Sequence, residues 1–102
     1  MTKLRAKVWL EKDGVPVLGG GRAELLETID EEGSIRKAAE KLGMSYRHAW
    51  EIIKKINRAW GEEVVHSNRG GRGGGKTMLT EGGRALLKEY NKKAAALLRV
   101  LK

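Results

Sequence analysis

The stretch that decides the fold is Ser34-Ile-Arg-Lys-Ala-Ala-Glu-Lys-Leu-Gly43-Met-Ser45, which predicts a short helix, a turn and the start of another helix. Apolar residues recur at i, i+3, i+4 and i+7 from Ile35, and Ser34 is a good N-cap. Gly43 can adopt the left-handed conformation that ends a helix, and Ser45 can cap the next one. With the small Ala39 four residues before the glycine, this order is typical of a helix-turn-helix.

The helix that Ser45 opens is expected to run to Trp60, and its two faces differ sharply. One stripe is apolar: Ala49, Ile52, Ile53, Ile56 and Trp60. The opposite stripe is charged and mainly basic: Arg47, Glu51, Lys54, Lys55 and Arg58. The apolar stripe must pack against the preceding helices, so the basic stripe is left for solvent or for phosphate. Another three-helix bundle could show similar spacing, and the basic stripe favours DNA binding over that alternative.

The N-terminal part of the chain predicts a hairpin followed by a helix. Residues 4–10 alternate between apolar and polar, the period of a half-buried strand. Asp13-Gly14 predicts the turn, and the return strand over 15–18 should lie at an edge because its proline cannot donate a ladder hydrogen bond. The glycines at 19–21 are expected to separate this hairpin from a helix over residues 22–33.

A basic, glycine-rich segment, Arg69-Gly-Gly-Arg-Gly-Gly-Gly-Lys76, follows the recognition-helix candidate after a short apolar spacer. Short strands are expected on both sides of it, at 64–66 and 77–79, so the segment reads as the tip of a wing. Its arginines, Arg69 and Arg72, are then placed to reach phosphates or the minor groove.

The same segment also satisfies the phosphate-binding pattern G-x-x-x-x-G-K-T over residues 70–77. Such a loop must open directly into a helix, whereas here Met78 and Leu79 intervene and the best N-cap is Thr80. The chain also lacks a second apolar strand ending in a magnesium-binding aspartate. Nucleotide binding is therefore the weaker alternative, and no catalytic residues are predicted.

Thr80 is expected to open a long closing helix over residues 80–102. An apolar seam in this helix steps by three and four residues, the spacing of a coiled-coil contact. Its members are Leu87, Tyr90, Ala94, Leu97 and Leu101. We expect this seam to pack against its twin in a homodimer, because a chain of 102 residues buries only a modest core alone.

The formal charge of +8 is concentrated where these motifs lie. Residues 1–35 carry five Lys/Arg against seven Asp/Glu (−2), residues 36–76 carry ten against four (+6), and residues 77–102 carry six against two (+4). This distribution suits a polyanionic partner. A chain without cysteine, signal peptide or long apolar run is expected to be cytoplasmic, without membrane contact, metal site or cofactor.

Position within the helix-turn-helix assigns roles to individual side chains. Residues that open a recognition helix touch base edges, whereas later ones reach the backbone. The predicted base contacts are Ser45, Tyr46, Arg47, His48 and Glu51. The predicted backbone contacts are Ser34, Arg36, Lys37, Lys54 and Lys55. The predicted wing contacts are Asn68, Arg69, Arg72 and Lys76. Tyr46 and Trp50 border the apolar stripe, so packing is the alternative role for both.

Several runs together resemble the N-terminal DNA-binding domain of ModE-type molybdate-responsive regulators, winged-helix proteins related to the LysR group. The runs are Gly33-Ser-Ile35, Ala38-Ala39, Gly43-Met-Ser-Tyr-Arg-His-Ala-Trp-Glu51, the glycine-rich segment, and Leu79-Thr-Glu-Gly-Gly-Arg-Ala-Leu-Leu87. The resemblance covers nearly the whole chain. It implies a dimeric regulator with the Ser45 helix in the major groove and residues 69–76 on the wing. Family members sense molybdate through additional C-terminal domains, and no such domain or small-molecule effector is evident here.

The predicted fold is mainly α with small β hairpins: a single winged helix-turn-helix domain over residues 1–102. It divides into an N-terminal hairpin (1–20), the helix-turn-helix and wing (22–79) and a dimerisation helix (80–102). The predicted function is sequence-specific binding of double-stranded DNA in transcriptional regulation. The main alternative is a sequence-neutral, nucleoid-type DNA-binding protein.

Overall fold

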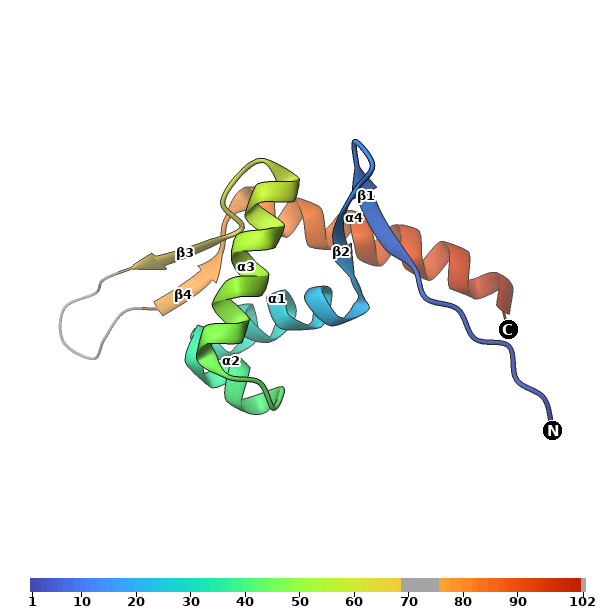
Figure 1. The fold of residues 1–102 in the computed structure, drawn as a ribbon, viewed down its shortest axis with the longest axis horizontal. Coiled ribbons are helices and arrows are strands. Elements are labelled where there is room, and N and C mark those ends of the chain that lie inside the picture. Colours follow the sequence, from blue (N-terminus) through green and yellow to red (C-terminus); the bar gives the residue numbers. More distant parts are fainter. Residues whose placement is uncertain (69–75, 102) are drawn as a thin grey trace.

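A computed structural model of the protein describes residues 1–68 and 76–101. The described part is helical with small antiparallel hairpins, as predicted. Its elements in chain order are β1 (Trp9–Lys12), β2 (Val15–Gly19), α1 (Gly20–Glu32), α2 (Ile35–Lys41), α3 (Tyr46–Trp60), β3 (Val65–Asn68), β4 (Lys76–Leu79), α4 (Glu81–Leu98) and a 3₁₀ turn (Arg99–Leu101). Strand β1 pairs with β2, and β3 pairs with β4. Figure 1 shows the two hairpins on opposite sides of α3, and both chain ends far from the β3–β4 hairpin.

The core forms around α1, which contacts α2, α4 and both hairpins. Leu25, Leu26 and Ile29 of α1 are completely buried, as are Ile53 and Ile56 of α3. The predicted apolar stripe of α3 therefore faces inward. Truncating either α3 isoleucine to alanine should cost roughly 2–5 kcal/mol, because the site cannot fully collapse around the lost atoms.

The helix-turn-helix forms through the caps that the sequence predicts. The Ser34 hydroxyl accepts a hydrogen bond from the Lys37 N–H at 3.1 Å, and the Ser45 hydroxyl accepts one from the His48 N–H at 3.0 Å. Gly43, with φ of +70°, makes the left-handed turn after α2. Helices α2 and α3 contact each other, and the small Ala39 and Ala49, one on each helix, are both buried.

The predicted strand over residues 4–10 is wrong at its N-terminal end. Strand β1 begins only at Trp9, and Leu4 is 74% exposed. The reason lies in the partner strand: Trp9 pairs with Gly19, and the next residue already belongs to α1. No extended segment remains to pair with the chain before Trp9, so alternation alone cannot form a strand there.

The start of the first helix also differs from the prediction. Gly20 and Gly21 form its first turn and do not separate it from the hairpin. The Arg22 guanidinium donates to the carbonyl of Val17 at 3.0 Å, which ties this turn back to β2. Contacts of the folded chain thus outweigh the low helix propensity of glycine.

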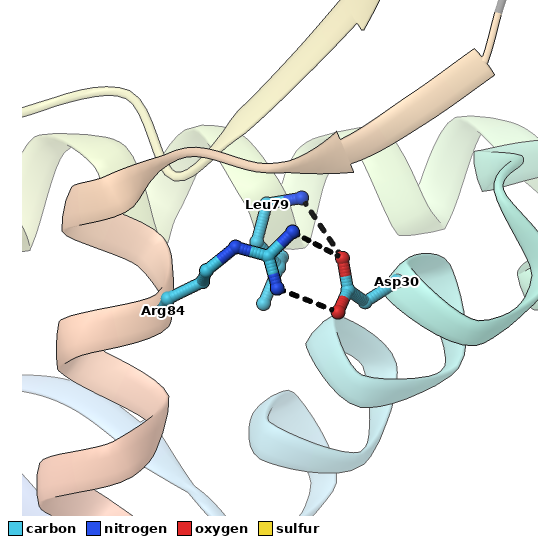
Figure 2. Close-up of polar contacts among 3 residues, drawn as sticks. All are labelled: Asp30, Leu79 and Arg84. Atoms are coloured by element: carbon cyan, nitrogen blue, oxygen red, sulfur yellow. Dashed lines mark hydrogen bonds and ion pairs between the residues drawn. The ribbon is translucent and has the colours of Figure 1, made fainter.

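The β3–β4 hairpin is fastened to the helices at two points. The Thr77 N–H donates to the Gly33 carbonyl at 2.9 Å, joining β4 to the α1–α2 junction. Figure 2 shows the second point: Asp30 accepts two hydrogen bonds from the Arg84 guanidinium, at 3.0 and 3.2 Å, and one from the Leu79 N–H at 3.3 Å. One carboxylate therefore links α1, β4 and α4.

Candidate nucleic-acid interface

The outer face of α3 presents the predicted recognition residues to solvent. Arg47, His48, Glu51, Lys54 and Lys55 are all exposed. Arg47 and Glu51 form an ion pair at 3.5 Å, with 91% and 55% of their side chains exposed. A pair this exposed stabilises the helix little, so Arg47 can exchange it for a base edge at small cost. The first turns of α3 are therefore open to a macromolecular partner.

Tyr46 lies between two other helix-turn-helix side chains. The Arg36 guanidinium carbon of α2 stands 4.4 Å from the centre of the Tyr46 ring. Trp50 meets the same ring edge-on, with the ring centres 6.4 Å apart. Tyr46 remains 41% exposed. Arg36 and Trp50 thus hold a partly open aromatic ring at the start of the recognition helix.

Ser34 and Ser45 already have a structural task, since each hydroxyl oxygen accepts a backbone N–H as a helix N-cap. Each hydroxyl keeps its own hydrogen for donation to a phosphate or a base. Lys37 is exposed beside Arg36 on α2. The structure thus brings Arg36 of α2, a predicted backbone contact, to Tyr46 at the beginning of α3.

The wing residues fall partly within the described chain. Asn68 and Lys76 pair across the end of the β3–β4 hairpin, and Asn68 also contacts the ring of His66, Oδ1 to Nε2, at 3.1 Å. Arg69 and Arg72 lie outside the described residues. Lys76 and Thr77 belong to strand β4, and α4 begins only at Glu81. The phosphate-loop alternative needs a helix directly after these residues, so the strand argues against it.

The predicted seam of α4 does not form one exposed stripe. Tyr90 is buried in its own chain, and its hydroxyl donates to the Val8 carbonyl at 3.2 Å. Leu97 is 58% exposed and Ala94 half-buried, and both border a hollow against β1. Leu87 lines a different hollow, beside Asp30. The Leu101 side chain lies outside the described part. The heptad spacing therefore contributes residues to the core of the chain as well as to its surface.

A second basic cluster lies at the far end of α3, and the sequence predicted its α3 members, Lys55 and Arg58, as part of the basic stripe but not Lys12 and Arg22. A pocket of about 540 Å³ lies between the β1–β2 hairpin and the last turns of α3. Its charged lining residues are Lys12, Asp13, Arg22, Lys55 and Arg58. Four of these five are cations. No pattern of neighbouring residues in the sequence predicts the whole cluster, because its members come from the hairpin, from the start of α1 and from α3.

Within residues 1–68 and 76–101, no helix has the length and apolar character that a membrane crossing requires. The same residues contain no group of three or more histidine, aspartate or glutamate side chains placed to hold a metal ion.

Comparison with known proteins agrees with this geometry. The chain is 37% identical over 98 residues to the molybdenum-pterin-binding protein MopA of Rhodobacter capsulatus, covering 96% of this chain and 37% of MopA. It is 39% identical over 89 residues to the molybdenum transport protein ModE of Azotobacter vinelandii, covering 87% and 33%. The DNA-binding transcriptional dual regulator ModE of Escherichia coli K12 is 37% identical over 70 residues, covering 69% and 27%. The chain thus spans about a third of the length of these relatives, and the predicted resemblance to ModE-type proteins is confirmed.

A solved structure supports the fold independently. The ArgP protein of Mycobacterium tuberculosis superposes with a TM-score of 0.60 at 23% identity, over 80% of this chain and 29% of that one. Residues 22–84, from the first turn of α1 to the first turn of α4, match the bacterial regulatory helix-turn-helix proteins of the lysR family. The chain belongs to this lysR family.

Proposed function

We propose that the protein binds double-stranded DNA in a sequence-specific way and regulates transcription. The observation that carries the proposal is the exposed start of α3, where Arg47 and its neighbours face solvent, in a fold that places the β3–β4 hairpin on one side of α3 (Figure 1). The core anchors this helix through its opposite face, where Ala49, Ile53 and Ile56 are completely buried. The E. coli relative is itself a DNA-binding transcriptional regulator by name. Such a protein would work in the cytoplasm, where it can reach the chromosome.

The proposed roles follow from side-chain chemistry. Arg47 offers a guanidinium fork that matches the two acceptors of a guanine edge, and Glu51 can accept from a cytosine amino group. Ser45, Tyr46 and His48 complete the base-reading set at the start of α3. The cations Lys37, Arg36, Lys54 and Lys55, together with Ser34 and the wing residues, would hold phosphates and so set affinity more than sequence preference.

We also propose that the protein acts as a homodimer. Apolar side chains from both ends of the chain remain exposed: Leu97 is 58%, Trp9 55% and Val100 80% exposed. Val8, Trp9 and Leu97 border one hollow, so β1 and the end of α4 form a single apolar surface. A second copy would cover this surface and present two α3 helices to a pseudo-palindromic site about one DNA turn apart.

Selection of binding sites from random duplex tests the proposal. A regulator should enrich a two-fold symmetric site and prefer it over random duplex by roughly 10³-fold or more at fixed salt. A nucleoid-type protein would bind both duplexes with similar affinity, and that result would reject the regulator. Arg47→Ala should reduce the preference at one base pair of each half-site while binding to random duplex stays nearly unchanged. Lys92→Ala, a charge change on the outside of α4, is the matched control.

A further inference from the structure

The β1–β2 hairpin has a position that neither the motif nor the family match explains. In Figure 1 it stands beside α3 on the side opposite the β3–β4 wing. Strand β2 contacts α3 directly, and the pocket that holds the second basic cluster lies at this contact. When two hairpins flank a recognition helix, each hairpin can contact the DNA backbone.

Two cations of this pocket are fixed in place by neutral partners. The Lys12 ammonium donates to the Trp60 carbonyl at 2.7 Å and stands 5.2 Å from the centre of the Trp60 ring. The Arg22 guanidinium donates to the Val17 carbonyl at 3.0 Å. A carbonyl or an aromatic ring orients a cation without cancelling its charge. Both side chains therefore lose less conformational freedom when an anion arrives.

The rest of the lining leaves this charge uncompensated. Lys55 and Arg58 are exposed on α3 and complete a set of four cations. Among the described residues none of the four lies within ion-pair distance of a carboxylate, and Asp13 is the one acid in the lining. The hollow beside Asp30 is lined by three cations, Arg84, Lys88 and Lys92, and there the Arg84 charge is already paired with Asp30 (Figure 2).

We propose that this pocket holds a backbone phosphate of the bound duplex, so that the β1–β2 hairpin acts as a second wing. The inference rests on the proposed function. Arg58 lies eleven residues after Arg47 on α3, a rise of roughly 16 Å along the helix axis. That length is comparable to the width of the major groove, about 12 Å. One helix can therefore read bases near its start while its last turn and Lys12 approach the strand at the groove's edge.

The test combines charge removal in the protein with charge removal in the DNA. Arg58→Gln and Lys12→Gln, singly and together, neutralise the pocket, and Lys88→Gln with Lys92→Gln makes the same charge change on α4. If the pocket holds one phosphate, the slope of log K against log salt should become shallower by about 0.9 for the pocket variants, on selected and random duplex alike. The α4 control should keep the wild-type slope. Thermal unfolding of each variant shows that the fold is intact.

Single phosphates of the selected site are then replaced by neutral methylphosphonate. At one position per half-site, this replacement should weaken binding by the wild-type protein by roughly fivefold or more. The same replacement should not weaken binding by the double pocket variant any further. A slope equal to that of the α4 control, or the absence of such a position, would overturn the inference. So would a pocket that binds inorganic phosphate, detected by NMR shifts at these residues, while the DNA slope stays unchanged. If the proposed function is wrong, the result is different: the wild-type protein then shows no preference for any duplex sequence.

Discussion

Two adjacent glycines at the start of α4 should respond in opposite ways to the same substitution. A Cβ added at Gly83 would meet the backbone carbonyl of Val64. A Cβ added at Gly82 would meet the carboxylate end of the Glu62 side chain, which can rotate away. Gly83 is buried, and the Val64 carbonyl also accepts the Thr80 N–H at 3.0 Å. Gly83→Ala must therefore push α4 away from Val64, the residue before β3, and strain that hydrogen bond.

The expected magnitude combines three contributions. Overpacking against backbone costs about 1–3 kcal/mol, and the strained hydrogen bond costs about 1 kcal/mol. The higher helix propensity of alanine offsets up to about 1 kcal/mol of this cost. Gly83→Ala should thus lower the free energy of unfolding by roughly 1–3 kcal/mol, whereas Gly82→Ala should leave it unchanged or raise it by up to about 1 kcal/mol.

Urea and thermal unfolding of both variants measure this difference. A loss of about 2 kcal/mol corresponds to a melting point roughly 8–16 °C lower for a domain of this size. Because Gly83 lies against Val64, directly before β3, its variant should also displace the β3–β4 hairpin and so bind DNA more weakly. Equal stabilities of the two variants would refute the close approach of α4 to Val64.

Five further substitutions test other contacts. Asp30→Ala removes acceptors from both Arg84 and the Leu79 N–H, so it should destabilise the fold by about 2 kcal/mol in urea unfolding. Arg84→Ala breaks only the half-exposed ion pair and should cost less than about 1 kcal/mol; the reverse order would contradict Figure 2. Ser45→Ala should lose about 1 kcal/mol of N-cap stability, whereas Ser45→Asp should retain the cap yet repel DNA, seen as weaker binding at unchanged melting point. Leu97→Glu should convert a dimer to a single 11.3 kDa chain in light scattering, and a wild-type mass of one chain would remove the dimer proposal.

Local chemistry accounts for what could be predicted from the sequence. Ser34, Gly43 and Ser45 act through hydrogen bonds and backbone angles a few residues away, so their caps and turn appear in the fold as expected. The apolar stripe of α3 is equally local, since helical periodicity alone determines which side chains share a face. The prediction of a strand before Trp9 failed because a strand needs a partner, and that partner lies elsewhere in the sequence. Alternation of residues 4–8 says nothing about whether β2 is long enough to pair with them.

The same distinction explains the missed half of the candidate site. The opening of α3 is a contiguous motif, and its exposed residues can be ranked by position in the helix. The pocket at the other end exists only because the hairpin packs against α3 and places Lys12 at the Trp60 carbonyl, 48 residues away in sequence. Lys12 and Arg22 look like ordinary surface cations until that contact fixes them. Charge summed along the chain therefore understates this region: residues 1–35 carry a net −2, yet they supply two of the four cations that line this pocket.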